Sequence, residues 1–236
     1  MNDSLVQPPR IGKLARHRRR TLLFPMDPLG RKNFGSIPPD LVQKRISLLF
    51  SEVRVLPECL AAGPAVGAPT AAMVTEVLAH AGVERILVIG SCGAFAGRAA
   101  PGDILLVQSA WTACGVTAHY FGGQEEFTAP GDVGTRAESA LREAGFAPRS
   151  IAVVTTDAPF RETSDFLEKY HRRDVSAVEM EIAGVYAVAH HRGISAAAVV
   201  IAADTVGAAG WEYRKGFLTY GRRMHQLLPV LWNLEF

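Results

Sequence analysis

The chain contains few cysteines, and their pattern excludes several kinds of site. Cys59, Cys92 and Cys114 form no CxxC pair and have no Cys–His spacing that suits zinc. An odd and sparse count fits a reducing compartment better than a secreted disulfide scaffold. We therefore expect no metal centre and no disulfide bridge.

Long apolar runs and a strong net charge are absent as well. No stretch of about 18 apolar residues is present for a membrane span, and the first residues lack the apolar core of a signal peptide. The net charge of +2 gives no field that favours nucleic acid. Neither a P-loop nor a GxGxxG motif occurs, which disfavours sites for nucleoside triphosphates and dinucleotides. These absences predict a cytoplasmic protein without membrane or nucleic-acid partners.

The positive charge that is present gathers near the N-terminus, in KLARHRRR at residues 13–20. Residues 1–20 are polar and basic, and we expect them to form an arm outside the core. A solvated tail is the simpler interpretation of such a charge block, and contact with an anionic ligand or an acidic partner is the alternative. Residues 21–236 are expected to form one domain, because no linker or repeat divides them.

Short apolar runs alternate with helical segments along this domain. Helical spacing occurs in residues 40–50, and the Gly-rich segment SCGAFAGRAAPG is expected to be a turn. The alternation predicts an α/β fold, a single three-layer domain with a central mixed β-sheet flanked by helices. Strands are expected at TLLF, VRVLPECLAAG, RILVIG, DILLVQSAW, SIAVVTTD and AAAVVIAAD, and helices at TAAMVTEVLAHAG, EIAGVYAVAHHRG and the C-terminal end.

Polar residues follow several of these strands, at the end where α/β sheets bind ligands. Ser91 follows RILVIG, Asp204 follows AAAVVIAA, and Glu179 and Glu181 flank Met180 where an extended run gives way to a helix. A carboxyl group that follows an apolar run, such as that of Asp204, is expected to be buried, and burial raises its pKa. A raised pKa suits a general acid. The alternative for Asp204 is a helix N-cap or a structural acceptor.

Two further features could contact a ligand. Glu181 offers two oxygens to vicinal sugar hydroxyls, although a Glu at a helix start is also favoured by the helix dipole. Phe160 could stack on a planar base, and Arg161 could donate to that base or to a phosphate, but a lone Phe is more often in a core. Candidates for the pocket edge are His119, Tyr120 and Trp211.

Residues 63–95 and 176–189, followed by IAADT, resemble the purine nucleoside and uridine phosphorylase family. The resemblance implies the phosphorylase/hydrolase-like α/β fold and cleavage of the N-glycosidic bond of a nucleoside. Phosphate is the nucleophile in phosphorylases and water in nucleosidases. The resemblance implies no cofactor, inorganic phosphate as the co-substrate, and a homo-oligomer (dimer, trimer or hexamer) in which a neighbour completes the site.

The resemblance also assigns roles to single residues. It implies that Glu181 binds the ribose hydroxyls, with Met180 against the sugar and Glu179 as the first carboxylate of the motif. It implies that Asp204 protonates or hydrogen-bonds the leaving base. Phe160, Arg161 and Val178 fall on the base side, and Ser91, Gly90 and Arg31 on the phosphate or water side.

Two departures from the family pattern concern phosphate. Phosphorylases usually carry an Arg two residues before the Gly of the GSCG segment, where this chain has Val88. They also carry a Gly before an Asp-Pro pair, where this chain has Met26. A dianionic phosphate needs several positive or N–H donors. These departures weaken the case for phosphate. The family resemblance still places phosphorolysis first, with a water-dependent nucleosidase and a non-catalytic nucleoside-binding homologue as alternatives.

Overall fold

The strands and helices follow the apolar periodicity of the chain. The computed structural model describes residues 5–11, 20–23, 34, 37–48 and 50–234. The strands are β1 (Arg20–Leu23), β2 (Lys44–Leu48), β3 (Ser51–Val55), β4 (Leu60–Gly63), β5 (Arg85–Phe95), β6 (Ile104–Ala113), β7 (Glu126–Thr128), β8 (Arg149–Thr156), β9 (Val175–Glu179), β10 (Ser195–Gly207) and β11 (Gly210–Glu212). The α-helices are α2 (Ala68–His80), α3 (Val133–Glu143), α4 (Ser164–His171), α5 (Ile182–Arg192) and α6 (Arg214–Trp232), and the 3₁₀ helices are η2 (Pro39–Leu41), η3 (Val116–His119) and η4 (Pro159–Arg161).

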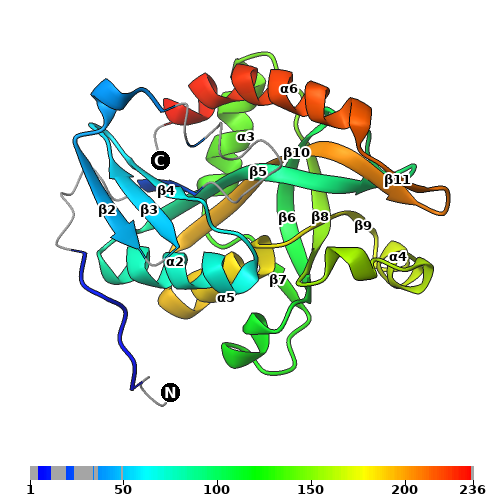
Figure 1. Cartoon of the computed structure of the whole chain (residues 1–236), viewed down its shortest axis with the longest axis horizontal. Coiled ribbons are helices and arrows are strands. Elements are labelled where there is room, and N and C mark those ends of the chain that lie inside the picture. Colours follow the sequence, from blue (N-terminus) through cyan, green and yellow to red (C-terminus); the bar gives the residue numbers. More distant parts are fainter. Residues whose placement is uncertain (1–4, 12–19, 24–33, 35–36, 49, 235–236) are drawn as a thin grey trace.

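These strands form one mixed sheet, in which β5 and β10 are the central pair (Figure 1). The two run parallel over nearly their whole length, with Ser195 opposite Arg85 and Val206 opposite Phe95. The pairings β5–β10, β10–β6, β6–β8, β8–β9 and β9–β5 also close on themselves. The predicted mixed-sheet α/β class is confirmed, and the closure brings β5, β9 and β10 around one space.

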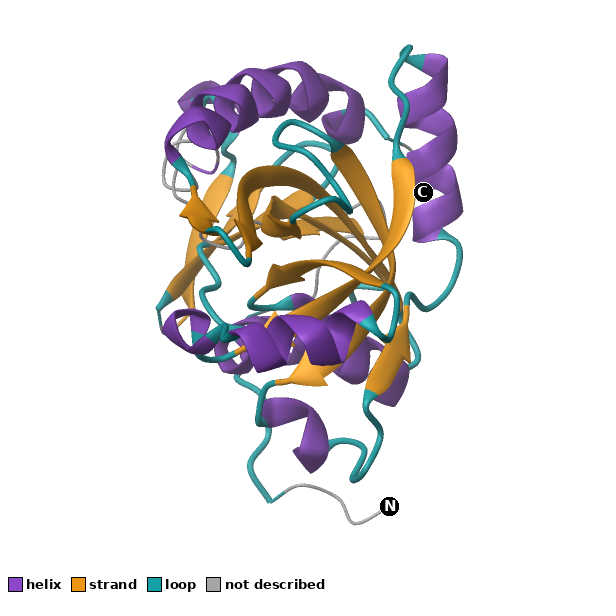
Figure 2. Cartoon of the chain, turned by 90° about the vertical axis from the view of Figure 1, so that its right-hand side faces the viewer, coloured by secondary structure: helices purple, strands orange, loops and turns teal. Residues whose placement is uncertain are grey.

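Both faces of the sheet are covered by helices (Figure 2). On β5, Ile86 and Val88 pack in the cluster that includes α2 and α5, while Leu87 and Ile89 pack in the cluster that includes α3 and α6. All four side chains are fully buried or nearly so. A strand covered on both faces needs a continuous apolar run, which explains the sequence RILVIG. No helix among the described residues is long and apolar enough to cross a membrane.

Two expectations about local structure were wrong. Residues 44–48 form strand β2, although residues 40–50 show helical spacing, because antiparallel pairing with β3 decides the conformation. The segment from Ser91 to Phe95 is not a turn. It continues β5, since Cys92 lies opposite Ala202 of β10 and Gly93 opposite Val178 of β9. Pairing with β9 and β10 outweighs the low strand propensity of Gly and Ser in this segment.

Candidate active site

A cavity of about 620 Å³ lies where β5, β9 and β10 approach one another. Ser91, Val178, Glu179, Met180, Glu181 and Asp204 line it, together with Phe160 and Trp211. These residues come from segments that are far apart in the sequence. The sheet therefore brings together most of the residues that the sequence singled out.

Glu179 ends β9 and is buried, with 6% of its surface exposed. Its Oε2 accepts hydrogen bonds from the backbone N–H groups of Glu181 and Ile182, each at 2.7 Å. Its Oε1 accepts the hydroxyl of Thr155, and Thr155 Oγ1 accepts the N–H of Ala183 at 2.8 Å. Burial raises the pKa of Glu179 to about 7, and these hydrogen bonds oppose the rise. Glu179 therefore fixes the start of α5.

Glu181 is the residue directly before α5 and is also buried. Its Oε1 accepts the backbone N–H of Gly67 at 2.7 Å. Gly67 has a φ of 77°, in the left-handed region that favours glycine, and it precedes α2. The contact ties the loop before α2 to the loop before α5 and sets the orientation of the Glu181 carboxylate beside Met180.

Asp204 lies on β10, opposite Gly93 of β5. A Cβ atom on residue 93 would be 3.0 Å from Asp204 Oδ1 and 3.3 Å from a methyl group of Val178. The glycine therefore leaves room for the carboxyl group. Trp211 of β11 donates its indole N–H to Asp204 Oδ2. Burial raises the pKa of Asp204, and the Trp211 hydrogen bond opposes this rise.

Glu162 is a lining residue that the sequence analysis missed. It follows η4 directly and is about half-buried. Burial and the negative charge of Asp204 raise its pKa to about 7. The only signal in the sequence was its place two residues after Phe160, in the segment TTDAPFRET. Thr155, which orients Glu179, lies in the same segment and was missed too.

Several predicted residues do not line the cavity. Gly90 lies inside β5, and Arg161 is exposed on η4. His119 and Tyr120 lie at η3, where the Tyr120 ring meets the His191 ring edge-on at 5.4 Å. Phe160 does line the cavity and is 93% exposed, so it is not a core residue. Arg31 lies outside the described residues.

The charged side chains that line the cavity are carboxylates. Glu162, Glu179, Glu181 and Asp204 belong to this set, and no Arg, Lys or His occurs among the described lining residues. Val88, which stands where phosphorylases usually have Arg, is buried in the core. No group of three or more His, Cys, Asp or Glu within the described part of the chain is arranged to hold a metal ion.

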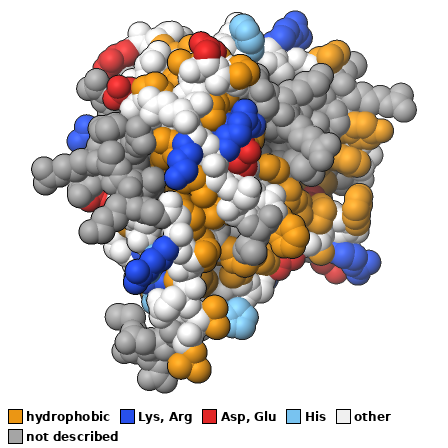
Figure 3. Space-filling model, turned by 60° about the vertical axis from the view of Figure 1, so that its left-hand side comes forward, with side chains coloured by type: hydrophobic (Ala, Val, Ile, Leu, Met, Phe, Trp, Pro, Cys, Tyr) orange, Lys and Arg blue, Asp and Glu red, His pale blue; other side chains and the backbone are white. Residues whose placement is uncertain are grey.

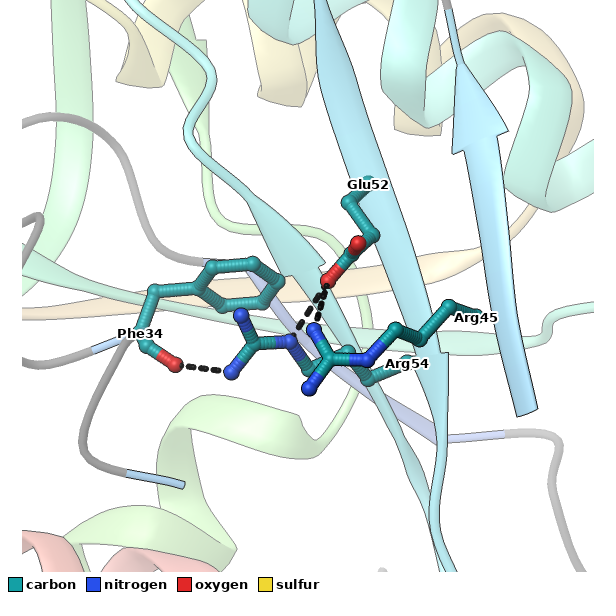
Figure 4. Close-up of polar contacts among 4 residues, drawn as sticks. All are labelled: Phe34, Arg45, Glu52 and Arg54. Atoms are coloured by element: carbon teal, nitrogen blue, oxygen red, sulfur yellow. Dashed lines mark hydrogen bonds and ion pairs between the residues drawn. The ribbon is translucent and has the colours of Figure 1, made fainter. Parts of the chain in front are cut away.

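Two arginines of the β2–β3 hairpin have partners of their own (Figure 4). Arg45 of β2 and Arg54 of β3 both contact Oε1 of Glu52, at 3.0 Å and 2.6 Å. Arg54 also donates to the carbonyl oxygen of Phe34 at 2.5 Å, and its guanidinium group lies 4.0 Å from the centre of the Phe34 ring. These contacts hold both groups at the β2–β3 hairpin, away from the cavity lining.

Comparison with known proteins assigns the family. The profile of the phosphorylase superfamily matches residues 34–228. The chain belongs to the phosphorylase superfamily. Its fold is also similar to that of AMP nucleosidase from Bacteroides thetaiotaomicron, with a TM-score of 0.70 over 91% of this chain and 89% of that one, at 16% identity. At this identity the likeness concerns the fold alone.

Curated relatives of this superfamily member are phosphorylases. Guanosine phosphorylase from Halorubrum lacusprofundi is 28% identical over 57% of this chain and 56% of its own length. A DeoD-type purine nucleoside phosphorylase from Bacillus cereus is 30% identical over 61% of this chain and 62% of its own. These matches span about three fifths of each relative. A longer match, to the DeoD-type enzyme of Shewanella amazonensis, is 29% identical over 79% of this chain and 81% of that protein.

Proposed function

We propose that this protein cleaves the N-glycosidic bond of a purine nucleoside. The observation that carries the proposal is that Glu181 and Asp204 face one cavity, with Met180 in the same lining. A carboxylate suited to vicinal hydroxyls and a desolvated carboxylic acid are the two groups that this cleavage needs. The relatives named above support the purine base.

Each group has a defined task in this reaction. Glu181, oriented by its hydrogen bond from Gly67, accepts the 2′ and 3′ hydroxyls of ribose. Asp204 gives a proton to the base as the C–N bond breaks, so the bond's electron pair leaves with a neutral base. The sugar carries positive charge at that moment, and the nearby carboxylates stabilise it. Glu179 holds the start of α5 and thereby positions Glu181.

Phosphate is the nucleophile that we propose first, because the curated relatives are phosphorylases. Ser91 lines the cavity and would donate to a phosphate oxygen. The cations that a dianion requires are not among the described lining residues. They would come from basic residues outside the described part of the chain, Arg31 among them, or from a second subunit.

Hydrolysis is the second candidate, and the carboxylate-rich lining favours it. Four carboxyl groups around one cavity repel a phosphate dianion but accept a water molecule. Val88 in place of the usual Arg adds to this preference. In this form the protein is a nucleosidase, and a lining carboxylate such as Glu181 takes the proton of the attacking water.

We also propose that the protein is a homo-oligomer. Phe50, Val66 and Met73 are large hydrophobic side chains with 83%, 41% and 42% of their surfaces exposed. Phe50 and Met73 line one apolar groove beside α2, and Val66 also lines the cavity. Exposed hydrophobic side chains gather on the face shown in Figure 3. A second copy that covers this face would therefore reach the edge of the cavity.

One assay tests the proposed function and separates its two forms. Adenosine, inosine, guanosine and uridine are incubated with the protein, with and without inorganic phosphate, and free base is measured. Release that requires phosphate and forms ribose 1-phosphate identifies a phosphorylase, and release without phosphate identifies a nucleosidase. Asp204→Asn should lower kcat by about 10²–10⁴-fold, whereas Asp165→Asn on exposed α4 should not. The absence of cleavage under all conditions would contradict the proposal.

A further inference from the structure

Glu162 lines the same cavity as Asp204, and the negative charge of Asp204 contributes to the raised pKa of Glu162. Its neighbours in the lining include Phe160, which the family resemblance assigns to the base side, and Trp211, which donates to Asp204. Glu181 and Met180 belong to the sugar side. In the proposed function, a base on this side of the cavity would meet two carboxyl groups, and only one of them is needed as the acid that protonates it.

Two carboxyl groups in one largely apolar cavity do not both ionise at low cost. Glu179 and Glu181 add negative charge to the same lining, and no positive side chain among the described lining residues offsets it. The pKa of Glu162 is raised to about 7 by burial and by the negative charge of Asp204, and burial raises the pKa of Asp204 as well. Near neutral pH the pair is expected to hold one proton, which gives it one hydrogen-bond donor and one acceptor.

We propose that Glu162 and Asp204 together recognise the N7 and 6-amino edge of a purine, so that the preferred substrates are 6-aminopurine nucleosides. Adenine presents an acceptor, N7, beside a donor, the 6-amino group, whereas a 6-oxopurine presents two acceptors there. One carboxylic acid and one carboxylate therefore match adenine. With a 6-oxopurine, the carboxylate would face the 6-oxo oxygen without a hydrogen bond. The inference rests on the proposed function and deepens it.

The proposed assignment gives a balanced step. Asp204 donates its proton to N7 while the carboxylate of Glu162 accepts an N–H of the 6-amino group. The C–N bond breaks with its electron pair on the base, which leaves as neutral adenine. The oxygen of water or phosphate bonds to C1′, and a proton from the nucleophile or from solvent returns to Asp204. Glu162 takes no part in the proton transfer and acts on specificity.

The test is the ratio of kcat/KM for adenosine to kcat/KM for inosine, in the presence of phosphate. The wild-type ratio is expected to be about ten or more, which is the preference that one charge-assisted hydrogen bond would produce. In Glu162→Gln the ratio should fall towards one, because a side-chain amide donates to a 6-oxo oxygen as readily as it accepts from an amino group. In Glu162→Ala it should also fall, because the side chain no longer accepts from the 6-amino group. Glu143→Gln on exposed α3 is the matched control, in which the ratio should not change.

A merely structural role of Glu162 would lower both activities together and leave their ratio intact, and that result would overturn the proposal. A wild-type preference for inosine or guanosine would overturn it as well. If no nucleoside is cleaved, the proposed function fails, and binding still tests the inference. Quenching of tryptophan fluorescence by free adenine and by hypoxanthine then gives the two affinities, and adenine must bind more tightly in the wild type but not in Glu162→Gln.

Discussion

Two effects act in opposite directions on the pKa of Asp204, and one of them comes from Trp211. Burial stabilises the protonated carboxyl group, whereas the indole N–H of Trp211 stabilises the ionised one. A general acid must hold its proton when the substrate binds. If Asp204 is the general acid that we propose, the strand pair β10–β11 adjusts the pH range of activity through a single hydrogen bond from Trp211, which is half-exposed.

Trp211→Phe is predicted to move the alkaline limit of activity to higher pH. Because the proposed mechanism uses Asp204 in its protonated form, kcat/KM should fall as pH rises through the pKa of Asp204. Loss of the indole N–H removes the influence that lowers this pKa, so the pKa rises and the acid form persists to higher pH. The measurement is kcat/KM between pH 5 and 10 for both proteins.

Trp111→Phe is the control for this substitution. Trp111 lies on β6, packs against the Arg173 guanidinium group and does not line the cavity. Its pH profile should match that of the wild type. A profile of Trp211→Phe that keeps its midpoint, or moves it to lower pH, would contradict the role assigned to the hydrogen bond. A change in rate alone would not, because the Trp211 ring also lines the cavity.

At the scale of elements, strand β5 determines where the Asp204 carboxyl group lies. Its continuation through Gly93 places a residue without a side chain opposite Asp204. Gly93→Ala is predicted to lower kcat by at least tenfold, because the added methyl group would lie 3.0 Å from Asp204 Oδ1 and force the carboxyl group to shift. Steady-state kinetics and thermal unfolding of the variant give the two quantities to compare.

Gly134→Ala provides the matched control. A Cβ there would lie 3.6 Å from that of Ala197, an ordinary contact, and residue 134 is inside helix α3. Alanine favours a helix over glycine by about 1 kcal/mol, so this variant should be as stable as the wild type or more so, with unchanged activity. Full activity in Gly93→Ala would show that Asp204 does not need its present position.

The same strand shows what the sequence could and could not predict. The apolar run of residues 85–90 was sufficient to predict a buried strand, and the VEME segment was sufficient to predict the passage from β9 to α5. The continuation from Ser91 to Phe95 depends on pairing with β10 and β9, which lie about a hundred residues away in the chain. Glu162 was missed for a similar reason, because only the tertiary fold brings it beside Asp204.

At the scale of the whole molecule, the cavity and the exposed hydrophobic side chains adjoin each other through Val66. The lining lacks cations in the described residues, and an apolar groove beside α2 leaves Phe50 and Met73 exposed to water. Both features have one explanation if a second subunit covers this face. Symmetric association of identical chains is also the commonest form of assembly.

Phe50→Asp is predicted to weaken this association. Burying a phenylalanine side chain contributes about 1.5–3 kcal/mol, so its replacement by a charged residue should raise the dissociation constant by at least tenfold. Light scattering over a dilution series gives the molar mass of the wild type and the variant.

Leu218→Asp is the control, since Leu218 is 74% exposed but lies on α6, across the sheet from α2 (Figure 1). A wild type that is monomeric at micromolar concentration would contradict the prediction. If association and activity fall together in Phe50→Asp alone, the neighbouring subunit completes the cavity.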